Sequence, residues 1–151
     1  MNTCQEENVQ TATSNKVYQI AAQCLGISLI PPGDDRELGC AISVTALLRE
    51  KCEIQIPETT STYNLLASLL ALPALFKEVA VPLPGDIIIA ATGTQPSTSP
   101  LSNGHTGVVA KYGILSNNSY TGLWSEVYTL RSWHNHYDII GQFRTRYFRP
   151  L

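Results

Sequence analysis

The residue pattern changes at Pro82, and this change restricts the possible folds more than any other feature of the sequence. Before Pro82, apolar residues recur at the spacing of amphipathic helices. After it, short β-branched and aromatic runs are separated by turn residues, which is typical of strands. These runs are PLPGDIIIAAT, TGVVAKY, ILSNNS, SEVYTL and QFRTRYF. The order predicts an α+β domain, with N-terminal helices packed on one face of a C-terminal antiparallel sheet.

Three helices are expected in the first half of the chain. Apolar spacing predicts the first over residues 16–25, ended by Gly26, and the second over residues 40–49. The third is expected within residues 60–79, with Ser61 or Thr62 as its N-cap and a break at Pro73. Five leucines of this third segment are expected in the core: Leu65, Leu66, Leu69, Leu70 and Leu72.

Length and composition limit the class of protein. The length of 151 residues indicates one domain, which we place at residues 16–151, after a flexible polar leader at residues 1–15. With 44% hydrophobic residues, disorder of the whole chain is excluded. The net charge is -2 and the basic residues are scattered apart from the run FRTRYFR, so no nucleic-acid partner is expected. No run is long and apolar enough for a membrane span, and no secretory signal is recognised at the N-terminus.

The four cysteines point to a reactive thiol rather than to a metal site. They form no C-x-x-C pair and have no histidines at metal spacing, so we expect reduced thiols and no metal ion. Cys40 follows a glycine at the start of the second helix, where the positive helix end favours a thiolate and lowers the pKa below about 8.5. The alternative for Cys40 is a small buried core thiol. Cys4 lies in the leader, Cys24 on a buried helix stripe and Cys52 after a helix end.

A cysteine nucleophile needs a base, and His105 is the best placed of the three histidines. It stands in NGHTGVV at the start of a strand, after the polar loop at residues 91–104. For His134 and His136, in the aromatic segment SWHNHYD, packing or surface roles are favoured. The imidazole also needs an orienting polar group. If the strands around VVAKYGILSNN form a tight hairpin, one residue of the pair Asn117 and Asn118 faces His105, and the alternative for this pair is a turn.

Together these residues resemble the NlpC-type and CHAP-type cysteine peptidases, which are relatives of papain. The resemblance covers residues 38–133: a cysteine at a helix start, then PGD at Pro84 to Asp86, then G-H-x-G-[IV]-V at Gly104 to Val109. It implies a papain-like NlpC/CHAP fold in which Cys40 is the nucleophile, His105 the base and Asn117 the orienting residue. The families often carry DCSG, or a Trp soon after the Cys, whereas this chain has GCAIS with Ser43.

The resemblance further implies hydrolysis of an amide bond in peptidoglycan stem peptides through an acyl-enzyme, as in phage lysins and other bacteriolytic enzymes, without a cofactor. The backbone N–H of Cys40 and a group from the GDDRELG segment are expected as oxyanion donors. Tyr18 is a further candidate donor, and core packing is the alternative for it. The polar loop at residues 92–103, with Trp124 and Trp133, offers hydrogen-bonding and stacking groups for a sugar-peptide polymer, and core packing is again the alternative for the two tryptophans. The residues expected to contact the substrate are Tyr18, Gly39, Ser43 and Trp124.

Two other functions are compatible with the same residues. One is a papain-like peptidase or acyltransferase that acts on protein, and the other is a non-catalytic virion or structural module of the same fold. For the wall hydrolase, we expect a monomer that is synthesised in the cytoplasm and delivered to the cell wall by a phage or another export route.

Overall fold

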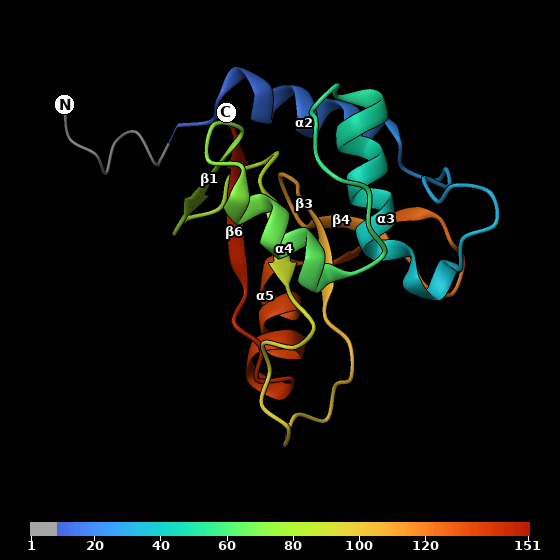
Figure 1. Cartoon of the computed structure of the whole chain (residues 1–151), viewed down its shortest axis with the longest axis vertical. Helices are drawn as coiled ribbons and strands as arrows, with labels where there is room; N and C mark the ends of the chain where they lie inside the picture. The colour runs from blue at the N-terminus through green and yellow to red at the C-terminus, as the bar shows by residue number, and fades with distance from the viewer. Residues whose placement is uncertain (1–8) are drawn as a thin grey trace.

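The structure is a computed structural model that describes residues 9–151, apart from the side chain of Glu37 (Figure 1). Cys4 and the first eight residues of the expected leader lie outside the described residues. Within the described part, the chain folds into an α+β domain with an antiparallel sheet of six strands. The α+β prediction is therefore confirmed at the level of fold class.

The first helix, α2, spans Ala12–Gln23 and begins four residues earlier than the spacing predicts. Thr11 caps it: the Thr11 hydroxyl accepts from the Ser14 N–H, and the Ser14 hydroxyl accepts from the Thr11 N–H. This reciprocal cap satisfies N–H groups that have no partner within the helix. The expected boundary of the leader at residue 15 is corrected, because residues 11–15 belong to the folded domain.

The second and third helices follow their predictions. Helix α3 spans Gly39–Ala46 and continues through the π-helical turn η2, Leu47–Lys51. Helix α4 spans Thr62–Ala71, with Ser61 as its N-cap, and it ends before Pro73. Of the five leucines expected in the core, three are buried, Leu70 is 49% exposed and Leu72 packs partly buried against the core: the buried ones are Leu65, Leu66 and Leu69.

The sheet has the strand order β1-β6-β2-β3-β4-β5, and every neighbouring pair is antiparallel. The five predicted strand segments all contain strands, and β1 was not predicted. The strands are β1 Phe76–Val79, β2 Ile87–Ala90, β3 His105–Val109, β4 Ile114–Asn117, β5 Trp124–Tyr128 and β6 Arg146–Pro150.

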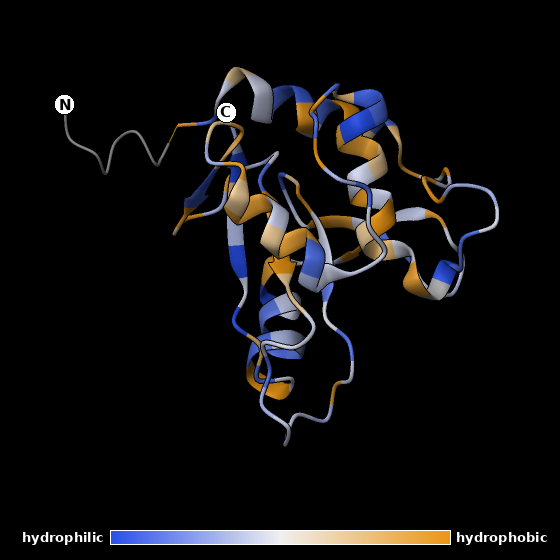
Figure 2. Ribbon diagram, in the orientation of Figure 1, coloured by the Kyte–Doolittle hydropathy of each residue, from blue (hydrophilic) through white to orange (hydrophobic). Residues whose placement is uncertain are grey.

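Both faces of the sheet are covered, so the prediction of helices on one face is incomplete. Side chains of successive strand residues alternate between the faces. Val108 belongs to the core beneath α2, α3 and α4, whereas Val109 belongs to a second core. This second core is covered by α5, Leu130–Trp133, and by the π-helical segment η3, His134–Ile140. Figure 2 shows hydrophobic residues along α3, α4 and β2.

The PGD element ties the N-terminal helix to the sheet. Gly85 has φ +95°, and a Cβ at this position would lie 1.8 Å from the Ser14 carbonyl oxygen, so only glycine fits. The next residue, Asp86, is fully buried and accepts two hydrogen bonds from the buried guanidinium of Arg149 on β6, at 2.9 and 2.8 Å. The Asp86 carboxylate also accepts from the Leu83 N–H at 2.7 Å. The element shared with the resembled families therefore has a structural role here.

No helix within residues 9–151 combines the length and the apolar character that a bilayer crossing requires.

Candidate active site

Cys40 lies where the N-terminal end of α3 meets two strands that part from each other. Strands β3 and β4 are paired at residues 108–109 and 114–115, next to the turn that connects them. Helix α3 packs against both strands. The backbone N–H of Thr106, on β3, lowers the pKa of the Cys40 thiol, so this strand lies close to the sulfur. The thiol is thus held between a helix end and the free edge of a strand.

Burial controls the protonation of Cys40. It raises the pKa of the thiol to about 11, although the backbone N–H groups of Ala41, Thr106 and Cys40 itself lower it. The sequence predicts a pKa below the usual value, and this prediction is wrong because desolvation of the thiolate outweighs the favourable helix end. At neutral pH the thiol is therefore protonated.

His105 is the first residue of β3, as its position after the polar loop predicts. It is surrounded by aromatic rings: its ring centroid lies 5.5 Å from that of Trp133, 5.9 Å from that of Tyr137 and 6.0 Å from that of Tyr128. Desolvation, and to a smaller extent the nearby His136, lowers the pKa of His105 to about 4. The imidazole is therefore neutral at pH 7.

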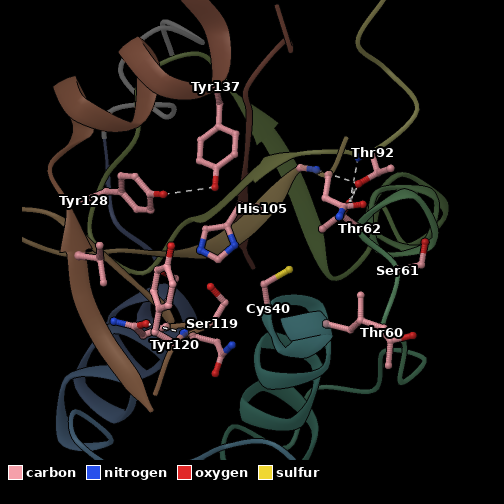
Figure 3. A pocket seen from close by; sticks show the side chains of 17 residues that line it. Cys40, Thr60, Ser61, Thr62, Thr92, His105, Ser119, Tyr120, Tyr128 and Tyr137 are labelled. Carbon is pink, nitrogen blue, oxygen red and sulfur yellow. Dashed lines mark hydrogen bonds between the residues drawn. The ribbon is translucent and has the colours of Figure 1, made fainter. Parts of the chain in front are cut away.

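Cys40 and His105 line the same cavity, which has a volume of about 520 Å³. Figure 3 shows them close together in it, with Tyr137 and Tyr128 beside the His105 ring. The thiol and the imidazole are not hydrogen-bonded to each other in the described structure. Most of the other lining residues carry hydroxyl or amide groups: Thr60, Ser61, Thr62, Thr92, Asn103, Ser116, Asn117, Asn118, Ser119, Tyr120, Tyr128 and Tyr137.

Both candidate orienting asparagines line the cavity, but neither amide is hydrogen-bonded to His105 in the described structure. Asn117 donates from its Nδ2 to the Arg36 carbonyl oxygen at 3.0 Å. Its Oδ1 is buried and has no hydrogen-bond partner among the described residues. Asn118 accepts from the Tyr120 N–H at 2.9 Å through its Oδ1, as in an Asx turn. Asn117 therefore fixes the approach to α3, and Asn118 fixes a turn after β4.

The four residues expected to contact the substrate are not among the described residues that line the cavity. Gly39 lies under Asn117, where a Cβ would be 2.7 Å from the Asn117 Nδ2. Ser43 is buried within α3. Trp124 is fully buried and donates from its Nε1 to the Ala21 carbonyl oxygen at 3.0 Å, so it belongs to the core. Tyr18 is half-buried on α2.

Cys24, Cys52 and His134 have structural surroundings. Cys24 and Cys52 are free and buried, and the burial of Cys24 was expected from its place on the helix stripe. His134 bonds through its two ring nitrogens to Asp138 and Tyr147, which fixes η3 to β6. No three described His, Cys, Asp or Glu residues form a group that could hold a metal ion.

The sequence analysis named Trp133 as a possible stacking group for the substrate, but it did not identify the aromatic wall around His105. Tyr128 ends β5, and Trp133 and Tyr137 follow it on α5 and η3. One signal was present: Thr129 and Ser132 form a capping box at the start of α5, and Trp133 and Tyr137 are four residues apart, which places them on one helix face.

Comparisons with protein-family models, curated proteins and solved structures find no match for this chain.

Proposed function

We propose that this chain is a papain-like cysteine hydrolase, similar to the NlpC and CHAP peptidases, that cleaves an amide bond in peptidoglycan. The observation that carries the proposal is the shared cavity: a cysteine at a helix start and a histidine at a strand start open into the same space. Residues far apart in the sequence meet there, as nucleophilic catalysis by a cysteine and a histidine requires.

The protonation states favour a neutral resting pair, so the His105 base acts during the attack. The Cys40 sulfur forms a bond to the amide carbonyl carbon while its proton passes to His105. The carbonyl π electrons move to oxygen, where the backbone N–H of Cys40 is a suitable donor. His105 then protonates the leaving amine as the C–N bond breaks, which leaves a thioester on Cys40. A water molecule, deprotonated by His105, hydrolyses the thioester and releases a carboxylic acid and the free thiol.

The polar lining supports a substrate that combines sugar and peptide. Hydroxyl groups of Thr60, Ser61 and Thr92 and the amide of Asn103 lie on the side contributed by α4 and the loop before β3. Tyr120 is 86% exposed at the cavity and offers an aromatic face. Hydroxyls, amides and an exposed ring suit the stem peptides of peptidoglycan and their attached sugars. Delivery to the wall by a phage or another export route is part of this proposal.

Zymography on purified cell walls tests the function. The wild type is expected to clear the wall layer, and Cys40→Ala and His105→Ala are expected to lose clearing. Cys24→Ala, which removes a buried cysteine outside the cavity, serves as the matched control. Equal clearing by the wild type and Cys40→Ala would defeat the proposal. Mass spectrometry of the released muropeptides then identifies the scissile bond.

Two observations favour a second candidate, a non-catalytic virion or structural module. The Cys40 thiol has a raised pKa and is not hydrogen-bonded to His105 in the described structure. Such a module would bind wall fragments without releasing new amines. Calorimetry with muropeptides, combined with an assay for new amino groups, separates binding alone from hydrolysis.

A further inference from the structure

We propose that an aromatic cage of Tyr128, Trp133 and Tyr137 positions the His105 imidazole, in the role that the sequence assigns to Asn117. Tyr137 is its principal positioning residue. The inference rests on the proposed function in one respect, namely that His105 is the base for Cys40. The cage itself is a property of the fold.

The ring geometry supports positioning by stacking. The planes of His105 and Tyr137 are 15° apart, with centroids at 5.9 Å, and Trp133 lies against His105 at 5.5 Å and 31°. Tyr128 meets the same imidazole edge-on, at 60°. Stacked and edge-to-face arrangements at these separations are favourable. The imidazole is therefore constrained from three directions by side chains of β5, α5 and η3.

The cage is anchored to the domain at several points. Trp133 is fully buried and donates from its Nε1 to the Thr145 hydroxyl at 3.0 Å. The Asp138 carboxylate accepts from the Thr145 N–H and hydroxyl at 2.9 and 2.8 Å. The Tyr128 and Tyr137 hydroxyl oxygens are 3.5 Å apart. These contacts hold the rings in place when no substrate is present.

Asn117 is engaged elsewhere. Its amide donates to the Arg36 carbonyl oxygen, and it lies directly over Gly39. Its Oδ1 is buried and has no partner among the described residues, so a bond to His105 is not formed. Moving Asn117 to His105 would break the contact that fixes the segment before Cys40.

The cage has a chemical consequence for the base. The titratable groups that face His105 are Tyr128 on β5, Tyr137 and His136 on η3, and Cys40 on α3. None of the described residues that line the cavity is Asp or Glu, so no carboxylate there stabilises an imidazolium. Aromatic walls also keep water from the ring. A caged His105 stays unprotonated, and hence able to accept a proton, in mildly acidic solution.

The test combines kinetics with an NMR titration of the His105 ring without substrate. Tyr137→Leu removes the stacked ring and is expected to lower kcat about 100-fold, the effect of a displaced catalytic group, with a smaller change in KM. The titration midpoint of His105 should rise from about 4 toward 6.5. Tyr137→Phe keeps the ring and should lose less activity than Tyr137→Leu. Tyr112→Phe, at a 79% exposed turn, is the matched control.

Tyr137 is buried, so Tyr128→Leu, at the partly exposed edge of the cage, is the second variant if Tyr137→Leu fails to fold. It should move the His105 midpoint upward by a smaller amount, whereas Asn117→Ala should leave the midpoint in place. A wild-type midpoint in both leucine variants, or a shift in Asn117→Ala alone, would overturn the inference. If the wild type hydrolyses no wall but the midpoints shift as expected, the proposed function fails and the cage stands.

Discussion

The buried ion pair between Asp86 and Arg149 predicts a large loss of stability on Asp86→Asn. The two side chains are 0% and 2% exposed, and two hydrogen bonds of 2.9 and 2.8 Å join them. Asp86→Asn removes the negative charge of this buried pair, and breaking a buried pair by removing one partner costs about 3–5 kcal/mol. For 151 residues the unfolding entropy is about 0.3 kcal/mol/K, so the Tm should fall by about 10–15 °C.

Strand β6, which carries Arg149, also provides a matched control. Arg146 and Glu78 also form two hydrogen bonds, each of 2.7 Å, but the Glu78 side chain is 40% exposed. Solvent screens this pair, so Glu78→Gln should cost less than about 1 kcal/mol. Urea unfolding followed by tryptophan fluorescence gives both free energies. Equal, small losses for Asp86→Asn and Glu78→Gln would refute the reasoning that burial makes the first pair indispensable.

Three further predictions follow from the same structure. Gly85→Ala should destabilise the domain by more than about 2 kcal/mol in urea, because its Cβ would meet the Ser14 carbonyl oxygen at 1.8 Å; Gly33→Ala, at φ +91° in open space, should cost less. The alkylation rate of Cys40 by iodoacetamide should climb with pH toward about 11, because the thiolate reacts; a plateau already at pH 7 would contradict this. If the protein is a hydrolase, its kcat/KM should increase as the pH rises through about 4, because His105 loses its proton there. An increase of kcat/KM near pH 6.5 instead would show that the His105 ring is hydrated and would contradict the prediction.

Most helices and strands could be predicted because their signals are local. Ser61 caps α4, Pro73 limits it, and the β-branched run after Asp86 forms β2. The start of α2 could not be placed, because its cap is a Thr and Ser pair in a polar segment that reads as disordered. Strand β1 was missed since it follows a leucine-rich helix and its pairing partner, β6, is distant in the sequence.

The positions of Cys40 and His105 near the start of a helix and of a strand could be predicted, because each element has a recognisable signal in the sequence. The raised pKa of Cys40 could not be predicted from the sequence, because the sequence shows a helix end but not the burial of the sulfur. The surroundings of His105 were also hidden. They depend on α5 and η3 covering the second face of the sheet, which is a tertiary contact.

The position of β6 has a consequence for how the protein is made. This strand, residues 146–150, lies inside the sheet between β1 and β2, and its Arg149 neutralises the Asp86 charge. A ribosome that has produced only the first 140 residues therefore carries a sheet with a missing interior strand and an unneutralised buried carboxylate. The native state, and with it any reactivity of the site, can form only after residue 150 has emerged, which favours folding in one late step.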